Sequence, residues 1–174
     1  FRDRKSFDNL SENVLPLLIK NKAANEPIRI WVAGCSTGEE AYSFAISIKE
    51  LLGNDPSSET EEKVQIFATD LSEPAIITAR LGIYKKLDLA GISAKRLNDY
   101  FTKTNDSYQI NRPLREMCVF ANHNFLKDPP FGKIDLISCR NVLIYLEPYL
   151  QKKALTTFHY ALNPKGFLLL GKSE

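Results

Sequence analysis

Short, nearly continuous apolar runs alternate along the chain with stretches in which apolar residues recur at helical spacing. Such runs are typical of strands buried on both faces, and the helical stretches are typical of helices that cover them. The predicted strands are Ile28–Ala33, Val64–Thr69, Cys118–Ala121, Ile134–Cys139 and Phe167–Leu170. The predicted helices are Phe7–Lys22, kinked or restarted at Pro16, then Glu39–Leu52, a helix capped by Ser72 that ends near Leu81, and Pro148–Leu162. The alternation predicts an α/β fold with a doubly wound, mostly parallel sheet in which Ile28–Ala33 is central.

The stretch from Tyr84 to Glu116 interrupts this alternation. A short helical piece, Ala94–Phe101, is followed by Tyr108–Ile110 and by a segment from Arg115 onward. The last two have the pattern of paired antiparallel strands around the turn residues 104–106. We therefore predict that residues 84–116 form a small inserted β lobe beside the cofactor cleft.

Composition limits the classes of protein that fit this pattern. At 174 residues, with 44% hydrophobic and 25% charged residues, the chain is one globular domain, residues 1–174. A net charge of +2 gives no argument for nucleic acid, and no apolar stretch approaches the roughly 20 residues that span a bilayer. Cys35, Cys118 and Cys139 lack C-x-x-C spacing, and the two histidines lie far from any cysteine pair. We expect buried free thiols, no metal, no membrane insertion and a cytoplasmic location.

The first predicted strand ends at a glycine-bearing turn, Gly34 to Gly38, which leads directly into a helix. Nucleotide-like cofactors bind above such turns. A helix N-terminus attracts phosphate, but here Glu39 and Glu40 occupy the first helical turn and would repel a pyrophosphate. S-adenosylmethionine (AdoMet) has no phosphate and carries a cationic sulfonium and an ammonium, so it fits this site better than NAD or ATP. The alternative is that both glutamates only stabilise the helix start.

Asp70 ends the second predicted strand, where a carboxylate can accept hydrogen bonds from ribose hydroxyls. It lies 32 positions after Gly38, and the polar loop Gly53–Glu62 accounts for 10 of these, which leaves 22 for one helix and one strand. The alternative is that Asp70 only caps a turn.

Polar residues also follow the third and fourth predicted strands, at the same edge of the sheet. Asn124 and Phe125 offer an amide and an apolar ring, which suit the edge and the face of an adenine. Arg140 and Tyr145 carry polar groups that need partners when buried, although Tyr145 could equally be an ordinary amphipathic core residue.

Four segments in this order, GCSTGEEAYSFAI, FATDLSEPAIITARLGIY, HNFL and SCRNVLIYL, resemble the chemotaxis-receptor glutamate methyltransferases of the CheR type. The resemblance extends over essentially the whole chain. It implies a Rossmann-like class I AdoMet methyltransferase fold. It also implies a protein-glutamate O-methyltransferase that modifies glutamates on cytoplasmic receptor helices and releases S-adenosylhomocysteine (AdoHcy). In this family, the small lobe can dock receptor segments.

The resemblance also implies roles for individual residues. AdoMet is expected across the turn that starts at Ala33 and Gly34, with Glu39 at its methionyl end, Asp70 on its ribose, Asn124 and Phe125 beside its adenine, and Arg140 and Asn141 lining the same pocket. Two residues are implied beside the transferred methyl group: Tyr145, and Arg2 in Phe1-Arg2-Asp3, which resembles the end of the family segment N-F-F-R-[DE]. Arg2 is also expected to contact the cofactor.

The family carries a helical N-terminal domain before this phenylalanine–arginine pair and continues past the G-x-S-E segment, here Gly171–Glu174. We therefore expect a piece of a longer protein. A carboxylate nucleophile is ionised at neutral pH and needs no general base, so the lack of a Ser-His-Asp arrangement agrees with methyl transfer. Two alternatives stay open: a methyltransferase for nucleic acid or small molecules, suggested by a faint likeness of 141–145 to N-P-P-Y, and an AdoMet-binding signalling module without catalysis.

Overall fold

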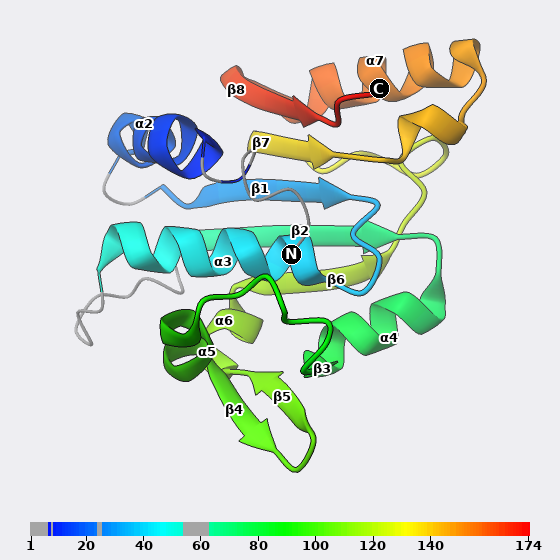
Figure 1. Ribbon diagram of the computed structural model, residues 1–174. Helices are drawn as coiled ribbons and strands as arrows, with labels where there is room; N and C mark the ends of the chain where they lie inside the picture. Colours follow the sequence, from blue (N-terminus) through cyan, green and yellow to red (C-terminus); the bar gives the residue numbers. More distant parts are fainter. Residues whose placement is uncertain (1–6, 8, 24–25, 54–62) are drawn as a thin grey trace.

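Five parallel strands form the central sheet of the computed structural model, which describes residues 7, 9–23, 26–53 and 63–174 (Figure 1). They are β1 (Ile28–Ala33), β2 (Val64–Asp70), β6 (Cys118–Asn122), β7 (Ile134–Cys139) and β8 (Leu162–Leu170). Their order across the sheet is β6-β2-β1-β7-β8. Ile30 of β1 pairs with Ile66 on one side and with Leu136 on the other. The predicted α/β fold with Ile28–Ala33 central is confirmed.

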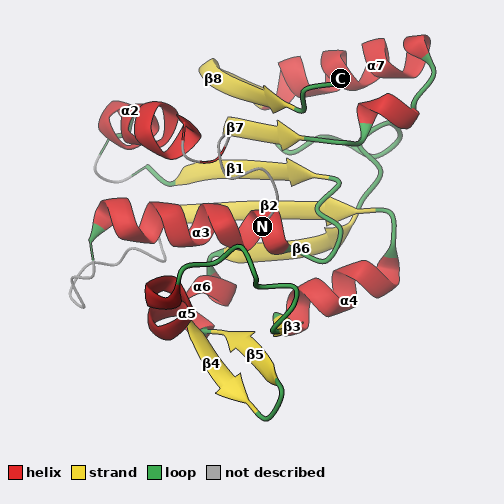
Figure 2. Cartoon of the chain, viewed as in Figure 1, coloured by secondary structure: helices red, strands yellow, loops and turns green. Residues whose placement is uncertain are grey.

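Helices cover both faces of this sheet (Figure 2). They are the π-helical turn η1 (Leu10–Val14), α2 (Leu15–Asn21), α3 (Glu39–Leu52), α4 (Glu73–Leu81), the 3₁₀ turn η2 (Leu143–Tyr145) and α7 (Pro148–Ala161). Alternate side chains of β1 divide between two hydrophobic clusters: Ile30 packs with residues of α2 and α3, and Trp31 packs with Phe158 of α7. The continuous apolar strands of the sequence are thus explained by burial on both sides.

The helix ends follow the signals expected from the sequence. Ser72 caps α4, its hydroxyl accepting from the Ala75 amide, and Gly38 precedes α3 in the left-handed region with φ 91°. The predicted helix Phe7–Lys22 is divided at Leu15, and Pro16 lies in the first turn of α2, so the predicted restart at this proline is confirmed.

A three-stranded antiparallel sheet lies between α4 and β6 in the chain, with strand order β3-β5-β4. This inserted element consists of β3 (Ile83–Lys85), α5 (Ala94–Tyr100), β4 (Phe101–Thr104), β5 (Ser107–Ile110) and α6 (Arg112–Glu116). The prediction of a strand from Arg115 onward was wrong, because this residue lies in α6. Pro113 explains the difference: its fixed φ suits the first turn of a helix, and it has no N–H to donate to a ladder.

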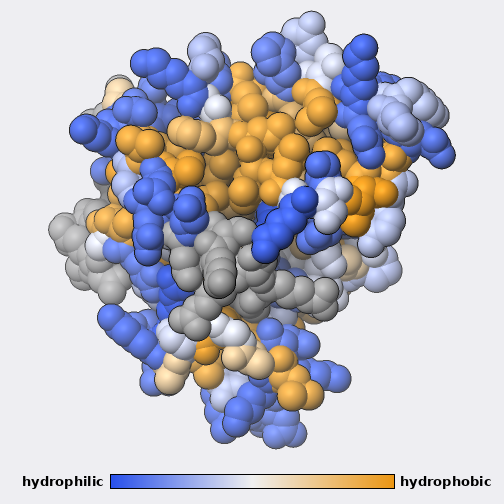
Figure 3. All heavy atoms as spheres, turned by 45° about the horizontal axis from the view of Figure 1, so that its top comes forward, coloured by the Kyte–Doolittle hydropathy of each residue, from blue (hydrophilic) through white to orange (hydrophobic). Residues whose placement is uncertain are grey.

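The two edges of the central sheet differ. At the β6 edge, the guanidinium of Arg80, from α4, donates from Nε and Nη2 to the main-chain oxygen of Phe120, at 3.1 and 2.9 Å. At the β8 edge, the strand begins at Leu162, and the predicted turn Asn163–Gly166 lies within the strand, where its register against β7 shifts. Figure 3, turned toward this edge, shows a hydrophobic area, and Leu168 of β8 is 36% exposed.

A buried carboxylate joins four elements at the amino end of the sheet. Asp135, on β7, is 5% exposed. It accepts from the main-chain amide of Arg29 on β1 at 2.9 Å and from Asn163 Nδ2 on β8 at 2.7 Å. It also forms an ion pair of 3.0 Å with Lys22, which directly follows α2. These contacts satisfy the charge within the protein.

Candidate functional site

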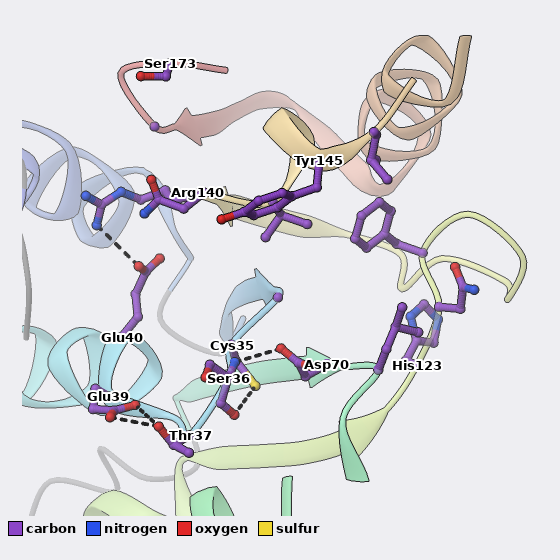
Figure 4. Close-up of a pocket in the computed structure, with 18 of the residues that line it drawn as sticks. Cys35, Ser36, Thr37, Glu39, Glu40, Asp70, His123, Arg140, Tyr145 and Ser173 are labelled. Carbon is purple, nitrogen blue, oxygen red and sulfur yellow. Dashed lines mark hydrogen bonds and ion pairs between the residues drawn. The ribbon is translucent and has the colours of Figure 1, made fainter. Parts of the chain in front are cut away.

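A cavity of about 850 Å³ opens at the carboxyl ends of the parallel strands. This is the edge at which ligands bind in doubly wound folds. The cavity brings together most of the residues predicted from sequence: Gly34, Glu39, Asp70, Asn124, Phe125, Arg140, Asn141 and Tyr145. Of these, Figure 4 labels Glu39, Asp70, Arg140 and Tyr145. They come from segments that follow four different strands, so only folding brings them together.

The glycine turn after β1 is closed by its own main-chain hydrogen bonds. The amides of Gly34 and Cys35 donate to the Thr69 oxygen, and the amide of Gly38 donates to the Cys35 oxygen. The amide of Ser36 donates to the Asp70 carboxylate at 2.8 Å. These four amides are therefore already engaged, whereas a phosphate-binding loop offers its amides to the ligand.

Gly34 is required by packing as well as by its backbone conformation, with φ 79°. A Cβ at this position would clash with Cγ2 of Val142, which belongs to the segment after β7. The glycine turn and the segment after β7 are therefore in direct contact, and they form adjoining walls of the cavity.

Asp70 is fixed at the end of β2 by two main-chain amides. Its Oδ2 accepts from Ser36 and its Oδ1 from Ser72, at 2.8 and 2.9 Å. Asp70 thus does act as a turn cap, as the alternative reading held. A carboxylate has about four acceptor positions, however, so a fixed Asp70 in the cavity wall retains capacity for ligand hydroxyls.

Glu39 and Glu40 both line the cavity, with different partners. Both carboxylate oxygens of Glu39 lie within hydrogen-bond distance of the Thr37 hydroxyl, at 2.8 and 2.7 Å. Glu40 reaches across to the end of β7, where it accepts from the Ser138 hydroxyl, and it pairs with Nη1 of Arg140, just after the strand, at 3.3 Å. Together with Asp70, they make this wall of the cavity acidic, which disfavours phosphates and suits a cationic ligand.

Tyr145 lies at the rim of the cavity, at the end of η2, with 82% of its surface exposed (Figure 4). The core alternative for this residue is therefore wrong. The segment that leads to it contains Asn141 in the left-handed region, with φ 58°, a conformation that asparagine tolerates better than most residues. The segment between β7 and η2 thus presents Arg140, Asn141 and Tyr145 to the cavity.

The segment after β6 is a compact turn held by local hydrogen bonds. Asp128 accepts from the Asn124 amide at 2.7 Å, and Asn124 Oδ1 accepts from the Leu126 amide at 3.0 Å. His123 Nε2 lies 3.0 Å from the Pro129 oxygen, which can only accept, so this nitrogen carries the proton. The turn places Asn124 and Phe125 in the cavity wall.

The three cysteines are buried free thiols, as predicted. Burial, followed by the negative charge of Asp70, raises the pKa of Cys35 from 9.0 to about 12. Burial, followed by the charges of Glu174 and Glu40, raises the pKa of Cys139 to about 12. Both thiols stay protonated at neutral pH, and they are not activated nucleophiles.

Two predicted site residues stand apart from the others. Ala33 is 1% exposed in the core at the end of β1, while its neighbour Gly34 reaches the cavity. Arg2 lies outside the described residues.

Several cavity residues were not singled out by sequence reasoning. They are Phe7, Ser36, Thr37, Ser43, His123, Leu126, Leu146 and the segment Gly171–Ser173. Glu40 was noted for its charge, but its contact across to Arg140 was not predicted. Glu174 was also missed, although its carboxylate accepts from the amides of Val142, Leu143 and Gly171. The position of the G-x-S-E segment after the last apolar run was the available signal, because that run also ends at this edge of the sheet.

The family model described as CheR methyltransferase, SAM binding domain, matches residues 1–174. The chain belongs to the CheR methyltransferase family. The cofactor of this CheR domain is S-adenosylmethionine. The chain is 37% identical over 177 residues to chemotaxis protein methyltransferase 1 of Vibrio cholerae, a match that covers 100% of this chain and 62% of that protein. It is 41% identical over 177 residues to an uncharacterized 104.1 kDa protein of Rhodobacter capsulatus, covering 100% of this chain and 18% of that protein.

The CheR chain therefore spans less than two thirds of the length of these two relatives. Among solved structures, the fold is similar to that of the DszA carbon methyltransferase, with a TM-score of 0.59 over 97% of this chain and 36% of that one. At 15% sequence identity, this likeness shows the class I methyltransferase fold alone. Within the described ranges of the CheR chain, no helix is long and apolar enough to cross a membrane.

Proposed function

We propose that this domain binds AdoMet and transfers its methyl group to glutamate side chains on the cytoplasmic helices of chemotaxis-type receptors. One observation carries the proposal: three carboxylates line a cavity beside a glycine turn in which the amides of Gly34, Cys35, Ser36 and Gly38 are already engaged. The carboxylates accept hydrogen bonds and attract positive charge. They therefore fit a ligand that has a nucleoside at one end, a cationic group at the other and no phosphate.

Each part of the cavity suits one part of AdoMet. Asp70, fixed by two amides, would accept from the ribose hydroxyls. Glu39, named by the resemblance, and Glu40 would face the cationic methionyl end, and both line the cavity. We place the adenine against Asn124 and Phe125, since an amide beside an apolar ring matches a planar base with a polar edge.

The wall after β7 would complete this binding site. Arg140 and Asn141 line it, and Glu40 pairs with Arg140. The pairing lowers the net positive charge of this wall, so the arginine would not repel a cationic ligand strongly. Arg2, by its resemblance to the family arginine, would close over the cofactor and the methyl group.

The chemistry asks the protein mainly to position its reactants. Bound AdoMet supplies an electrophilic methyl group on a sulfonium. A receptor glutamate, with an ordinary pKa of about 4.3, is already ionised at neutral pH, so no general base is needed. The exposed Tyr145 hydroxyl at the cavity rim would donate a hydrogen bond that orients the incoming carboxylate. Cys35 and Cys139 would not compete for the methyl group, because their raised pKa values keep them as thiols.

The relatives support the choice of substrate. The Vibrio cholerae relative is named a chemotaxis protein methyltransferase. The four segments that resemble glutamate methyltransferases contain all eight of the predicted residues that line the cavity: Gly34, Glu39, Asp70, Asn124, Phe125, Arg140, Asn141 and Tyr145.

Calorimetry with AdoHcy, ATP and NAD would test the cofactor. We expect saturable one-to-one binding of AdoHcy and no binding of the two phosphate-bearing ligands. Binding of ATP or NAD with similar affinity would contradict the cofactor assignment.

Methyl transfer needs a second experiment, with labelled AdoMet, the full-length protein and receptor helices. Matched peptides would carry glutamate or glutamine at the candidate position. Label that enters only the glutamate peptide and is released as methanol by mild alkali identifies a glutamyl ester. Alkali-stable label would instead show transfer to nitrogen, and it would contradict the proposed substrate.

A further inference from the structure

The carboxylate of Glu174 joins two segments that both form the wall of the cavity. Its Oε1 accepts from the amides of Val142 and Leu143, at 2.6 and 3.2 Å, and its Oε2 accepts from the amide of Gly171. The site is tightly built, since a Cβ at Gly171 would lie 2.5 Å from Oε2. Carboxylates that accept several main-chain amides form stronger hydrogen bonds than neutral groups do.

The two amides bound by Oε1 are those at the start of η2, the turn that ends at Tyr145. The Tyr145 amide donates to the Val142 oxygen at 3.2 Å, so Tyr145 is hydrogen-bonded to the residue whose own amide Glu174 binds. A short helical turn leaves its first amides without partners inside the turn, and Glu174 supplies these partners. The position of the Tyr145 main chain therefore depends on a residue 29 positions further along the chain.

Val142 connects Glu174 with the glycine turn on the cofactor side of the cavity. Its amide is held by Glu174, while its side chain packs so closely on Gly34 that no Cβ fits there. Asn141, directly before it, has a positive φ, a conformation that persists where the surroundings fix it. Glu174 thus holds the segment that lies between the glycine turn and Tyr145.

We infer that Glu174 is a positioning residue for methyl transfer. By binding the amides of Val142, Leu143 and Gly171, it fixes the segment that places Asn141 against the cofactor and Tyr145 at the rim. The inference rests on the proposed function for its effect on turnover. Its effect on cofactor binding and on the local amides is independent of which substrate is methylated.

Three variants of the full-length protein test this role. Glu174→Ala removes both oxygens. Glu174→Gln keeps one oxygen for the amides of Val142 and Leu143 and places an NH₂ against Gly171. Glu147→Ala is the matched control, because Glu147 is an exposed glutamate between η2 and α7 whose side chain caps nothing.

Hydrogen exchange measures the local effect directly. In Glu174→Ala, we expect faster exchange at Val142 and Leu143, with unchanged exchange in the core strand β2. AdoHcy affinity should fall about threefold, since Asn141 is one of several contacts. Turnover should fall about tenfold, because even a small misplacement of a reacting group is costly. Glu174→Gln should lie between this variant and the wild type, and Glu147→Ala should match the wild type.

A double-mutant cycle separates positioning from general stability. If Glu174 acts through Tyr145, Tyr145→Phe should lower turnover much less in the Glu174→Ala background than in the wild type. Additive losses would overturn the inference, and so would wild-type exchange, affinity and turnover in Glu174→Ala. Failure of both Glu174 variants to fold would assign the residue to global stability and would also overturn it. If the wild type binds AdoHcy but methylates no receptor peptide, the proposed substrate fails, while the exchange and affinity results still decide the role of Glu174.

Discussion

Both ends of the central sheet hold a carboxylate that main-chain amides fix in place, but the surroundings of the two carboxylates differ. At the amino end, Asp135 is 5% exposed, and its three partners, Arg29, Asn163 and Lys22, all belong to the protein itself. At the carboxyl end, Asp70 is held by two amides and lines a cavity of about 850 Å³. Both carboxylates therefore accept hydrogen bonds from the main chain, but only Asp70 lines an open cavity.

A charged residue at a strand end can thus be assigned to stability or to function by what surrounds it. A buried charge whose partners all belong to the protein contributes to the fold, and removing one partner leaves the other charge buried and unpaired. A charge that is fixed but faces a cavity keeps acceptor capacity for a ligand. Variants of Asp135 should therefore affect unfolding, and variants at the cavity should affect binding or turnover.

The largest expected effect is that of Asp135→Ala on stability. We expect the free energy of unfolding to fall by about 3–5 kcal/mol, because Lys22, with a side chain 17% exposed, loses its partner. Urea denaturation followed by circular dichroism measures it, with the exposed Asp106→Ala as control. If the free energy of AdoHcy binding to the folded Asp135→Ala variant also fell by about 3–5 kcal/mol, Asp135 would affect binding as well as stability. The assignment of Asp135 to the fold alone would then be wrong.

The thiol of Cys35 is a buried group at the cavity end of the sheet, so it combines features of both ends. Its pKa is raised from 9.0 to about 12, so it stays protonated as pH rises until the pH nears 12. At pH 8, the thiolate fraction should then be about a thousandfold lower than in the unfolded chain. We expect iodoacetamide to alkylate Cys35 slower in the native protein by a similar factor, measured by peptide mass spectrometry. Equal rates in the native and urea-unfolded protein would show that the cavity exposes this thiol.

Asp70→Ala tests the cavity end directly. Losing charge-assisted hydrogen bonds to the ribose, worth about 1.5–3 kcal/mol each before water offsets them, should weaken AdoHcy binding about ten- to a hundredfold. Asp70→Asn keeps one acceptor oxygen and should lose less. Unchanged affinity in calorimetry would remove the ribose assignment. A loss of stability as large as that of Asp135→Ala would make Asp70 a structural residue as well.

Tyr145→Phe should give the smallest effect, and only on the rate. The hydroxyl lies at the exposed rim, so we expect turnover to fall about tenfold, which is about 1.4 kcal/mol, with AdoMet affinity nearly unchanged. Tyr149→Phe, on α7 and 71% exposed, is the matched control and should behave as wild type. Wild-type turnover in Tyr145→Phe would exclude a role for the hydroxyl in transfer.

The central sheet could be predicted from sequence because its signals are local. The bounds of β1, α3 and β7 match the prediction, since buried parallel strands are continuous apolar runs that glycine or polar residues end. Strand pairing in the inserted element was less predictable. It depends on which edges meet after folding, and Pro113 starts a helix where the sequence pattern predicted a strand.

The cavity residues were predicted as far as their type and place in sequence determine them. Asp70 ends β2 and Asn124 follows β6, and a parallel sheet brings such positions together. The contacts of Glu40 and Glu174 were missed because each joins segments far apart in the chain, at separations of 98 residues to Ser138 and 32 residues to Val142. A local pattern contains no information about such partners.

The hydrogen bonds from Arg80 to the Phe120 oxygen affect how this protein can self-associate. An unpaired strand edge is a template for another chain, and a charged side chain on that edge prevents such pairing. Arg80 occupies the outward main-chain oxygen of β6, so intermolecular strand addition is disfavoured there.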